Sequence, residues 1–169
     1  MGGLIVKKAY LLGKNDPEYK HITKSIASII FLSTPHRGSN LAAVLHSILE
    51  VSFASKQYVT DLKRDSSILE ALNEEFRHIA PKLQIFSFYE TMETAISGTP
   101  IKTMVLNKES SVLGHAGEVS NFLVADHHDV CKFSDQEDPN YVTIRNLLAT
   151  LVARFRDASE SGLLRLRTI

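Results

Sequence analysis

The sequence has no tryptophan, a single cysteine and no apolar run of membrane-spanning length. Cys131 has no partner for an intramolecular disulfide, which argues against a disulfide-stapled secreted domain and favours an intracellular protein. The longest apolar stretch, residues 26–32, is far shorter than the roughly 20 residues needed to cross a bilayer, and no basic-then-apolar leader opens the chain. The sequence therefore predicts neither a transmembrane segment nor a secretory signal.

The chain also lacks an excess of charge of either sign. Lysines plus arginines and aspartates plus glutamates number 19 each. Without a net field, nothing in the composition favours a nucleic-acid partner. With 169 residues, 44% of them hydrophobic and 22% charged, the chain has the make-up of an ordered globular domain with a core of its own.

The hydrophobic periodicity alternates between strand and helix patterns, which is typical of an α/β fold. We expect a mostly parallel sheet flanked by helices over residues 1–157, followed by a tail or linker over 158–169. The predicted elements are a helix over 4–12, a buried strand over 26–32, helices from 40 onward and over 68–79, strands over 83–89 and 102–106, a glycine-bearing loop over 112–125, and a closing helix over 142–155.

The first predicted element is a helix that follows Gly2 and Gly3, a pair suited to a tight strand-to-helix turn. This arrangement implies that the strand feeding the helix precedes Met1, and that N-terminal strands of the sheet are absent from the given sequence. We therefore expect a bare sheet edge and an exposed apolar face. The Lys7 and Lys8 pair is interpreted as part of a solvated helix face.

Several short motifs resemble one family of α/β-hydrolases in the same order along the chain. The opening MGGLIVKKA is similar to the downstream flank of a G-x-S-x-G nucleophile elbow, whose serine would directly precede Met1. The family is the fungal serine active site containing protein and GPI inositol-deacylase-like group (DUF676-like), and the resemblance covers roughly residues 1–155. The other matching segments are FLSTPHRGS at 31–39, SFYET at 87–91, SSVLG at 110–114, DHHDVCKF at 126–133 and DPNY at 138–141.

This resemblance implies a serine esterase or lipase-like hydrolase that acts on ester bonds, possibly of the lipid or GPI type. Such enzymes need a nucleophilic serine, a histidine base, an acid that orients the base, and N–H donors for the oxyanion. One donor is the backbone N–H of the residue after the nucleophile, which here would be Met1. Because the sequence as given holds no serine before Met1, we expect the chain alone to be nearly inactive, and whether it is an enzyme stays open.

His127, in the last loop before the closing helix, is where the resemblance places the base. Glu90 ends the second predicted strand, where the acid of this fold usually projects toward the site. Glu109 is the alternative acid. Asn107 occupies a position where relatives often carry an acidic residue, but an amide cannot offset the charge of an imidazolium ion. His128, the neighbouring candidate for the base, is expected to point elsewhere. His36, in the TPHRG segment, is interpreted as a residue that shapes the loop beside the elbow.

No cofactor and no metal are expected. His127, His128 and Cys131 offer two or three ligands on one short turn, which falls short of a zinc site. The expected partner is a lipid or other ester substrate, with fused nucleotide-binding or repeat domains in a longer protein. The alternative function is a non-catalytic interaction or sensing module of such a protein. By resemblance, the location is cytoplasmic or associated with mitochondrial or endoplasmic reticulum membranes.

Overall fold

The computed structural model describes residues 2–36, 66–96 and 99–166. The predicted helix beginning at Asn40 and the proposed oxyanion donor Met1 lie outside the described residues. The chain forms two compact units, Met1–Cys131 and Lys132–Ile169, and each is considered by itself.

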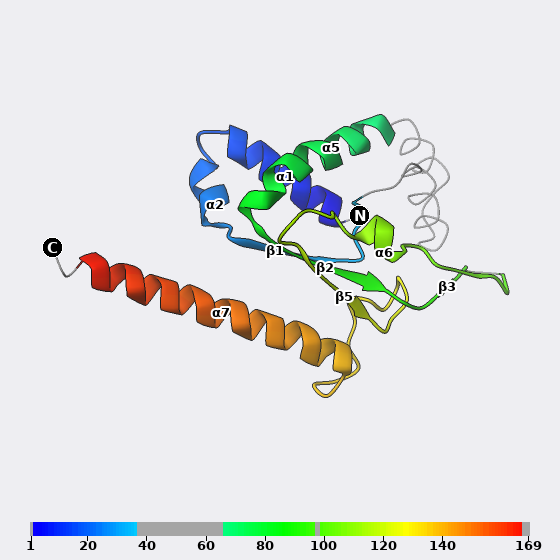
Figure 1. Cartoon of the computed structure of the whole chain (residues 1–169). Coiled ribbons are helices and arrows are strands. Elements are labelled where there is room, and N and C mark those ends of the chain that lie inside the picture. The colour runs from blue at the N-terminus through cyan, green and yellow to red at the C-terminus, as the bar shows by residue number, and fades with distance from the viewer. Residues whose placement is uncertain (1, 37–65, 97–98, 167–169) are drawn as a thin grey trace. The chain divides into compact units, whose positions relative to one another are not determined.

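The first unit is built on a three-stranded parallel sheet (Figure 1). Its strands are β1 (Ser28–Leu32), β2 (Gln84–Glu90) and β5 (Val119–Leu123), in the spatial order β1-β2-β5. The register places Leu32 beside Phe88 and Glu90 beside Leu123. The prediction of an α/β fold with a parallel sheet is therefore confirmed.

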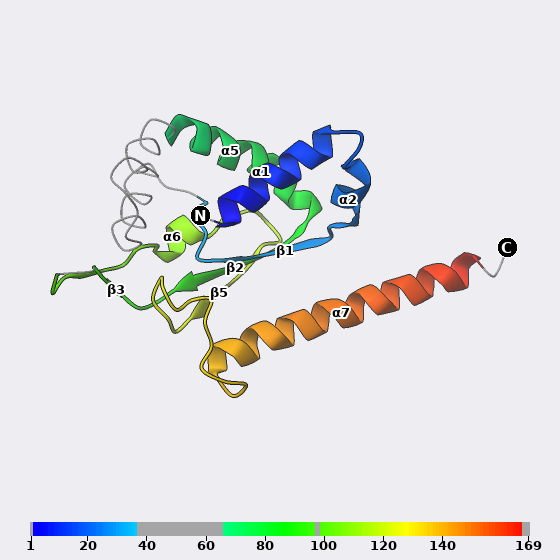
Figure 2. The same ribbon diagram turned by 180° about the vertical axis from the view of Figure 1, so that it is seen from behind.

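Helices α1 (Gly2–Asn15) and α5 (Ser66–Ile79) lie side by side on one face of this sheet (Figures 1 and 2). The short α2 (Lys20–Ser25) packs against α1 and returns the chain to β1. A single turn of 3-10 helix, η1 (Ala80–Lys82), contains Pro81 and links α5 to β2. The strands of a parallel pair start from the same end of the sheet, so the chain must cross back between them. Between β1 and β2, α5 and η1 form part of this connection.

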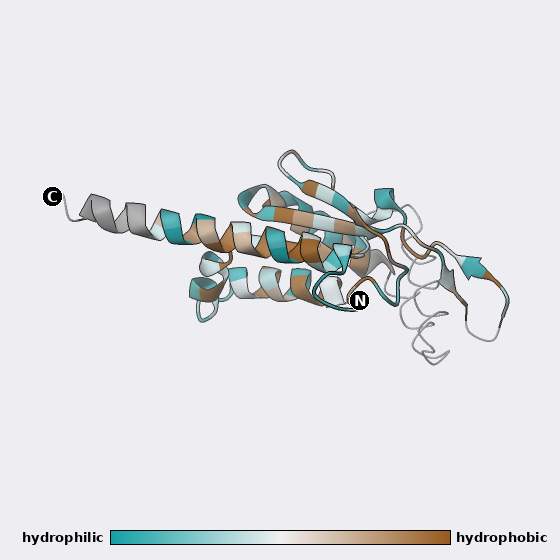
Figure 3. Ribbon diagram, turned by 90° about the horizontal axis from the view of Figure 1, so that it is seen from below, coloured by the Kyte–Doolittle hydropathy of each residue, from teal (hydrophilic) through white to brown (hydrophobic). Residues whose placement is uncertain are grey.

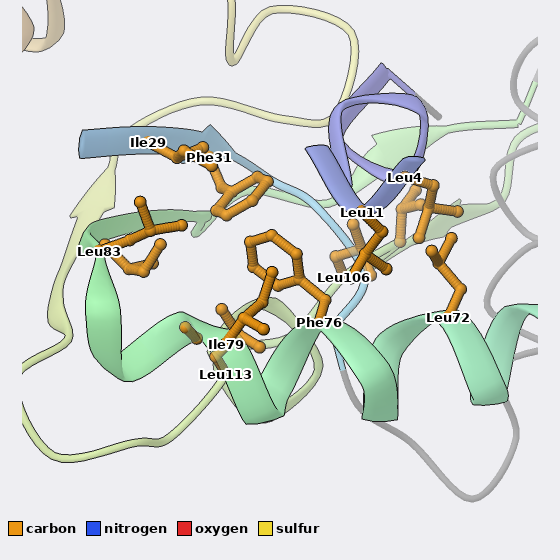
Figure 4. Packing of buried hydrophobic residues seen from close by; sticks show 13 residues of the cluster. Leu4, Leu11, Ile29, Phe31, Leu72, Phe76, Ile79, Leu83, Leu106 and Leu113 are labelled. Atoms are coloured by element: carbon orange, nitrogen blue, oxygen red, sulfur yellow. The ribbon is translucent and has the colours of Figure 1, made fainter. Parts of the chain in front are cut away.

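The core fills the space between these two helices and the sheet (Figure 4). Phe76 of α5 is wholly buried, and its ring meets those of Phe31 and Tyr10 edge-on, with centroids 5.9 and 6.2 Å away. Aromatic pairs prefer such edge-to-face geometry. The apolar side chains that surround these rings come from α1, α5, the strands, the link between η1 and β2, and the chain after β4: Leu4, Leu11, Ile29, Leu72, Ile79, Leu83, Ile85, Leu106 and Leu113.

The third strand of the sheet is not the one that the sequence predicted. Residues 102–106 contribute only β4 (Lys102–Thr103), which pairs antiparallel with β3 (Thr94–Ala95) in a separate two-stranded sheet. Val105 and Leu106 are buried in the core as loop residues. The place beside β2 is taken by β5, within the stretch predicted to be a loop.

Among the described residues, β1 and β5 are the two outer strands of the sheet. An apolar groove of about 840 Å³ runs between β1, α1 and α2; that further strands would cover the edge of β1 stays a prediction. Val6, Leu12 and Ile22 line this groove and remain between 46% and 58% exposed. Lys7, by contrast, is completely buried, so its placement on a solvated face was wrong. It lies between Leu4 and Leu11 on the buried face of α1.

The second unit consists mainly of α7 (Pro139–Leu166). Hydrophilic and hydrophobic residues follow one another in bands along its described part (Figure 3). The helix continues to Leu166, whereas the sequence placed its end near Phe155. That residues 158–169 act as a tail or linker stays a prediction. Among the described residues, no helix is both long enough and apolar enough to cross a membrane.

Candidate active site

Glu90 is a buried carboxylate at the carboxyl end of β2, with a relative exposure of 2%. Its Oε1 accepts a hydrogen bond from the backbone N–H of Leu106 at 2.8 Å, and its Oε2 lies 2.7 Å from Nδ1 of His127. A backbone N–H can only donate, so Oε1 is the acceptor of the bond from Leu106. The hydrogen bond between Oε2 and Nδ1 of His127 fixes the orientation of the imidazole ring.

His127 lies in a tight turn that follows β5. Its backbone N–H donates to the buried hydroxyl of Thr94 at 2.9 Å. The carboxylate of Asp126 accepts the N–H groups of His128 and Asp129 at 2.9 and 3.0 Å, which closes the turn. Aspartate favours such turns because its side chain can bond to the backbone two or three residues further on. The position of His127 is therefore fixed through the backbone as well as through its ring.

The pairing of β2 with β5 brings the acid and the imidazole together. Glu90 is in register with Leu123, and both residues are buried. The turn begins two residues later, where the carbonyl of Ala125 accepts the N–H groups of Thr91 and Met92. The chain after β5 is thus held against the chain after β2, at the carboxyl edge of the sheet. This is the edge at which open α/β sheets form their sites.

The ring of His127 borders a small cavity of about 280 Å³ beside the start of α1. Within the described residues its Nε2 makes no hydrogen bond, so the nitrogen that faces away from Glu90 is available for proton transfer. The other residues that line the cavity come from α1, β1 and the segments after β1 and β5: Gly2, Gly3, Val6, Ile30, Phe31, Leu32, Ser33, Thr34, Val130 and Cys131.

The start of α1 approaches the end of β1 so closely that only glycine fits at Gly3. A Cβ atom there would lie 2.2 Å from Oγ1 of Thr34 and 2.8 Å from its Cβ, whereas a Cβ at Gly2 would meet nothing within 4 Å. Ser33 precedes Thr34 with a φ of 41°, in the left-handed region that favours glycine. Its N–H donates to the Phe88 carbonyl at 2.8 Å, which holds this strained turn against β2.

The structure separates the two acid candidates. Glu109 is exposed in the first turn of the short helix α6 (Lys108–Ser111), and within the described residues its carboxylate makes no hydrogen bond to His127. Asn107 is the N-cap of α6, and its Oδ1 accepts the N–H of Ser110 at 2.8 Å. Asn107 therefore caps the N-terminus of α6, and the negative charge of Glu109 in the first turn suits the helix dipole. Of the two carboxylates, only Glu90 contacts the imidazole.

His36, interpreted as structural, is buried next to the core. Its ring meets Phe31 edge-on at 4.6 Å, and its backbone N–H donates to the Ser110 carbonyl at 2.7 Å. Thr94 and Leu106, which hold His127 and Glu90, were not singled out from the sequence. Thr94 contributes a hydroxyl and Leu106 a main-chain N–H, and neither group produces a recognisable sequence motif.

A parallel sheet with helical crossovers, a carboxylate ending one strand and a histidine after the next strand define a partial α/β-hydrolase fold. The chain is 38%, 37% and 36% identical to Protein SERAC1 of Danio rerio, Bos taurus and Homo sapiens, over 134, 134 and 136 residues. The similarity covers 78% of this chain but only about a fifth of the length of these curated relatives. No family profile and no solved structure matches the chain.

Proposed function

We propose that this chain carries the base and the acid of a serine-hydrolase site that cleaves carboxylic esters, with His127 as the base and Glu90 as the acid. The observation that carries the proposal is the 2.7 Å bond from Nδ1 of His127 to a buried carboxylate, beside a cavity that borders the first turn of α1. The similarity to Protein SERAC1 and the family resemblance of the motifs support a hydrolase of the same kind.

In this mechanism Nε2 of His127 removes the proton of a serine hydroxyl while the serine Oγ forms a bond to the ester carbonyl carbon. The carbonyl electrons move to its oxygen, which accepts hydrogen bonds from N–H groups at the start of α1, with Met1 as the proposed donor. When the tetrahedral intermediate collapses, the alcohol leaves with the proton from Nε2. Water then releases the acyl group by the same steps. Glu90 offsets the charge of the imidazolium ion.

The proposal assigns the nucleophile to the residue that precedes Met1 in a longer reading frame. The site would accept an ester whose acyl group enters the cavity of about 280 Å³, which is lined largely by apolar groups and suits a lipid or other uncharged acyl chain. Because the chain corresponds to about a fifth of the relatives, the substrate of a whole protein belongs to this proposal as well.

The test uses the chain extended upstream in its natural reading frame through a Gly-x-Ser segment. Turnover of a p-nitrophenyl ester and labelling by a fluorophosphonate probe are measured for the parent and for His127→Ala, Glu90→Gln and Glu109→Gln. We expect kcat to fall by about 10⁴-fold or more for the first two variants, since each removes a function of the triad. Glu109→Gln leaves kcat unchanged. His128→Ala is the matched control, because His128 is the exposed neighbour in the same turn.

Turnover that survives His127→Ala in a protein with an unchanged melting temperature overturns the assignment of the base. A reading frame without an upstream serine, or a parent that neither reacts with the probe nor hydrolyses esters, favours the other class of function. In that case the chain serves as a non-catalytic interaction or sensing module of a nucleotide-binding or repeat protein.

A further inference from the structure

The strand that leads to His127 is weakly specified by its own side chains. Four of the five residues of β5 are exposed, and only Leu123, at its end, is buried. The register of a strand is well specified where one of its faces is buried, and poorly specified where both faces meet solvent. Apolar contacts therefore anchor β5 at one end only.

A polar cluster holds the other end of β5. Glu118 directly precedes the strand, and its Oε1 accepts hydrogen bonds from the hydroxyl of Ser87 at 2.5 Å and from the N–H of Leu113 at 3.0 Å. Its Oε2 accepts the N–H of Gly114 at 2.5 Å. Ser87 is completely buried in the middle of β2. The carboxylate thus ties the centre of β2 to the loop that delivers β5.

The geometry of the proposed site depends on this register. Glu90 lies three residues after Ser87 on β2, and His127 follows Glu118 through β5 and its turn. A shift of β5 by two residues preserves the orientation of its faces but displaces the turn by about 6.6 Å, at about 3.3 Å per residue. Such a displacement is far larger than the 2.7 Å that separates Nδ1 of His127 from Glu90.

We propose that Ser87 and Glu118 are positioning residues, whose mutual hydrogen bond sets the register of β5 on β2 and so keeps His127 on Glu90. A hydrogen bond to a carboxylate is about twice as strong as one between neutral groups, and its donor here is shielded from water. The bond therefore replaces the apolar contacts that β5 lacks. Only the catalytic consequence of this arrangement rests on the proposed function; the geometric part does not.

The experiment is NMR on the chain as given, which needs no catalytic activity. The readouts are the low-field resonance of the His127 Nδ1–H proton and the contacts between backbone protons of Glu90 and Leu123. In Ser87→Ala we expect the ratio of paired to unpaired His127 to fall about tenfold or more, the change expected on loss of a hydrogen bond to a charged group. Glu118→Ala acts in the same way. Glu118→Gln, which keeps one carbonyl oxygen, restores most of the signal.

Thr23→Ala is the matched control for general destabilisation. It removes the hydrogen bond that the hydroxyl of the buried Thr23 donates to the Lys20 carbonyl at 3.1 Å within α2. Spectra are compared at conditions where each variant is equally folded, as judged by far-ultraviolet circular dichroism. Persistence of the His127 resonance and of the Glu90–Leu123 contacts in Ser87→Ala overturns the positioning role. Their equal loss in Thr23→Ala overturns it too.

The two proposals fail in different ways. If the NMR signals respond as expected but the upstream-extended parent hydrolyses no ester, the positioning role stands and the proposed function falls. If the extended parent is active, Ser87→Ala is expected to lower kcat and leave KM nearly unchanged, because it disturbs the base and not the acyl cavity.

Discussion

Nζ of Lys7 lies 2.6 Å from Oδ1 of Asn73, inside the core. It also donates to the Pro35 carbonyl at 3.3 Å, and it sits 5.6 and 5.8 Å from the ring centroids of Phe31 and Phe76. One amine therefore links α1, α5 and the segment after β1. Burying an ammonium group disfavours its charged form, even where aromatic rings and two acceptors surround it.

This burial makes folding depend on pH. Desolvation lowers the pKa of Lys7 from 10.5 to about 7, partly opposed by the negative charge of Glu118. Between these two values the unfolded chain binds more protons than the folded one, so the free energy of unfolding rises as pH increases from 7 to 10.5. The contribution of Lys7 to this rise is on the order of 5 kcal/mol. Lys7→Met removes it, and chemical denaturation at several pH values measures the loss.

Lys8→Met is the matched control, because Lys8 is the exposed neighbour on the same helix. Its free energy of unfolding keeps the pH dependence of the parent. Comparing the variants cancels the contribution of the other titrating groups. An unchanged slope in Lys7→Met shows that Lys7 keeps its usual pKa in the folded protein.

The two glycines that open α1 provide a second prediction. Gly3→Ala places a methyl group against Thr34, which must move together with the start of the helix. We expect a loss of about 1–3 kcal/mol in the free energy of unfolding, the usual cost of overpacking. Gly2→Ala meets no atom within 4 Å and replaces a poor helix former, so it leaves stability unchanged or raises it by up to about 1 kcal/mol.

Thermal and urea unfolding of the two alanine variants measure this difference directly. Thr34→Ala is the rescue variant, because it removes both Oγ1 and Cγ2, which would lie 2.2 and 2.4 Å from the new methyl group. The double variant Gly3→Ala with Thr34→Ala should regain part of the lost stability. Equal stability of Gly2→Ala and Gly3→Ala contradicts the close packing of α1 on the end of β1.

The sequence predicted the buried strands better than the exposed one. β1 and β2 have runs of branched and aromatic residues, and both were found within two residues of their ends. β5 has the sequence VSNFL, with four exposed residues and no strict alternation of apolar and polar side chains. Its place is set by backbone pairing and by the carboxylate of Glu118, which no periodicity reveals. The run at 102–106 was predicted to be the third strand because it contains the apolar residues Val105 and Leu106. Both are core residues, but they lie in a loop.

The two residues of the candidate site that lie in recognisable motifs, His127 and Glu90, could be predicted from the sequence. The structure brings His127 and Glu90 together, and their catalytic roles stay predictions. Lys7 shows the opposite case. Its spacing of three residues from Leu4 and four from Leu11 indicates the buried face of a helix, but its charge argued for solvent. Burial of this amine depends on acceptors from α5 and from the segment after β1, which are distant in the sequence.

The last prediction concerns Asp138, which caps α7. Its Oδ1 accepts the N–H groups of Asn140 and Tyr141 at 2.8 and 3.4 Å, and its Oδ2 accepts the N–H of Ser134 at 3.1 Å. These bonds, led by that from Ser134, lower the pKa of Asp138 below 3.8. The capping contribution is therefore complete above pH 3.8 and is lost as the pH falls through the lowered value.

Hydrogen exchange of the amides of Tyr141 and Val142, corrected for intrinsic rates, follows the fraying of the first turn. We expect protection in the parent to decrease on acidification below pH 3.8. Asp138→Asn keeps a capping oxygen but no titrating group, so its protection stays constant over the same range. Asp138→Ala loses protection at every pH. A parent whose protection is as independent of pH as that of Asp138→Asn shows that the capping bonds do not require the ionised carboxylate.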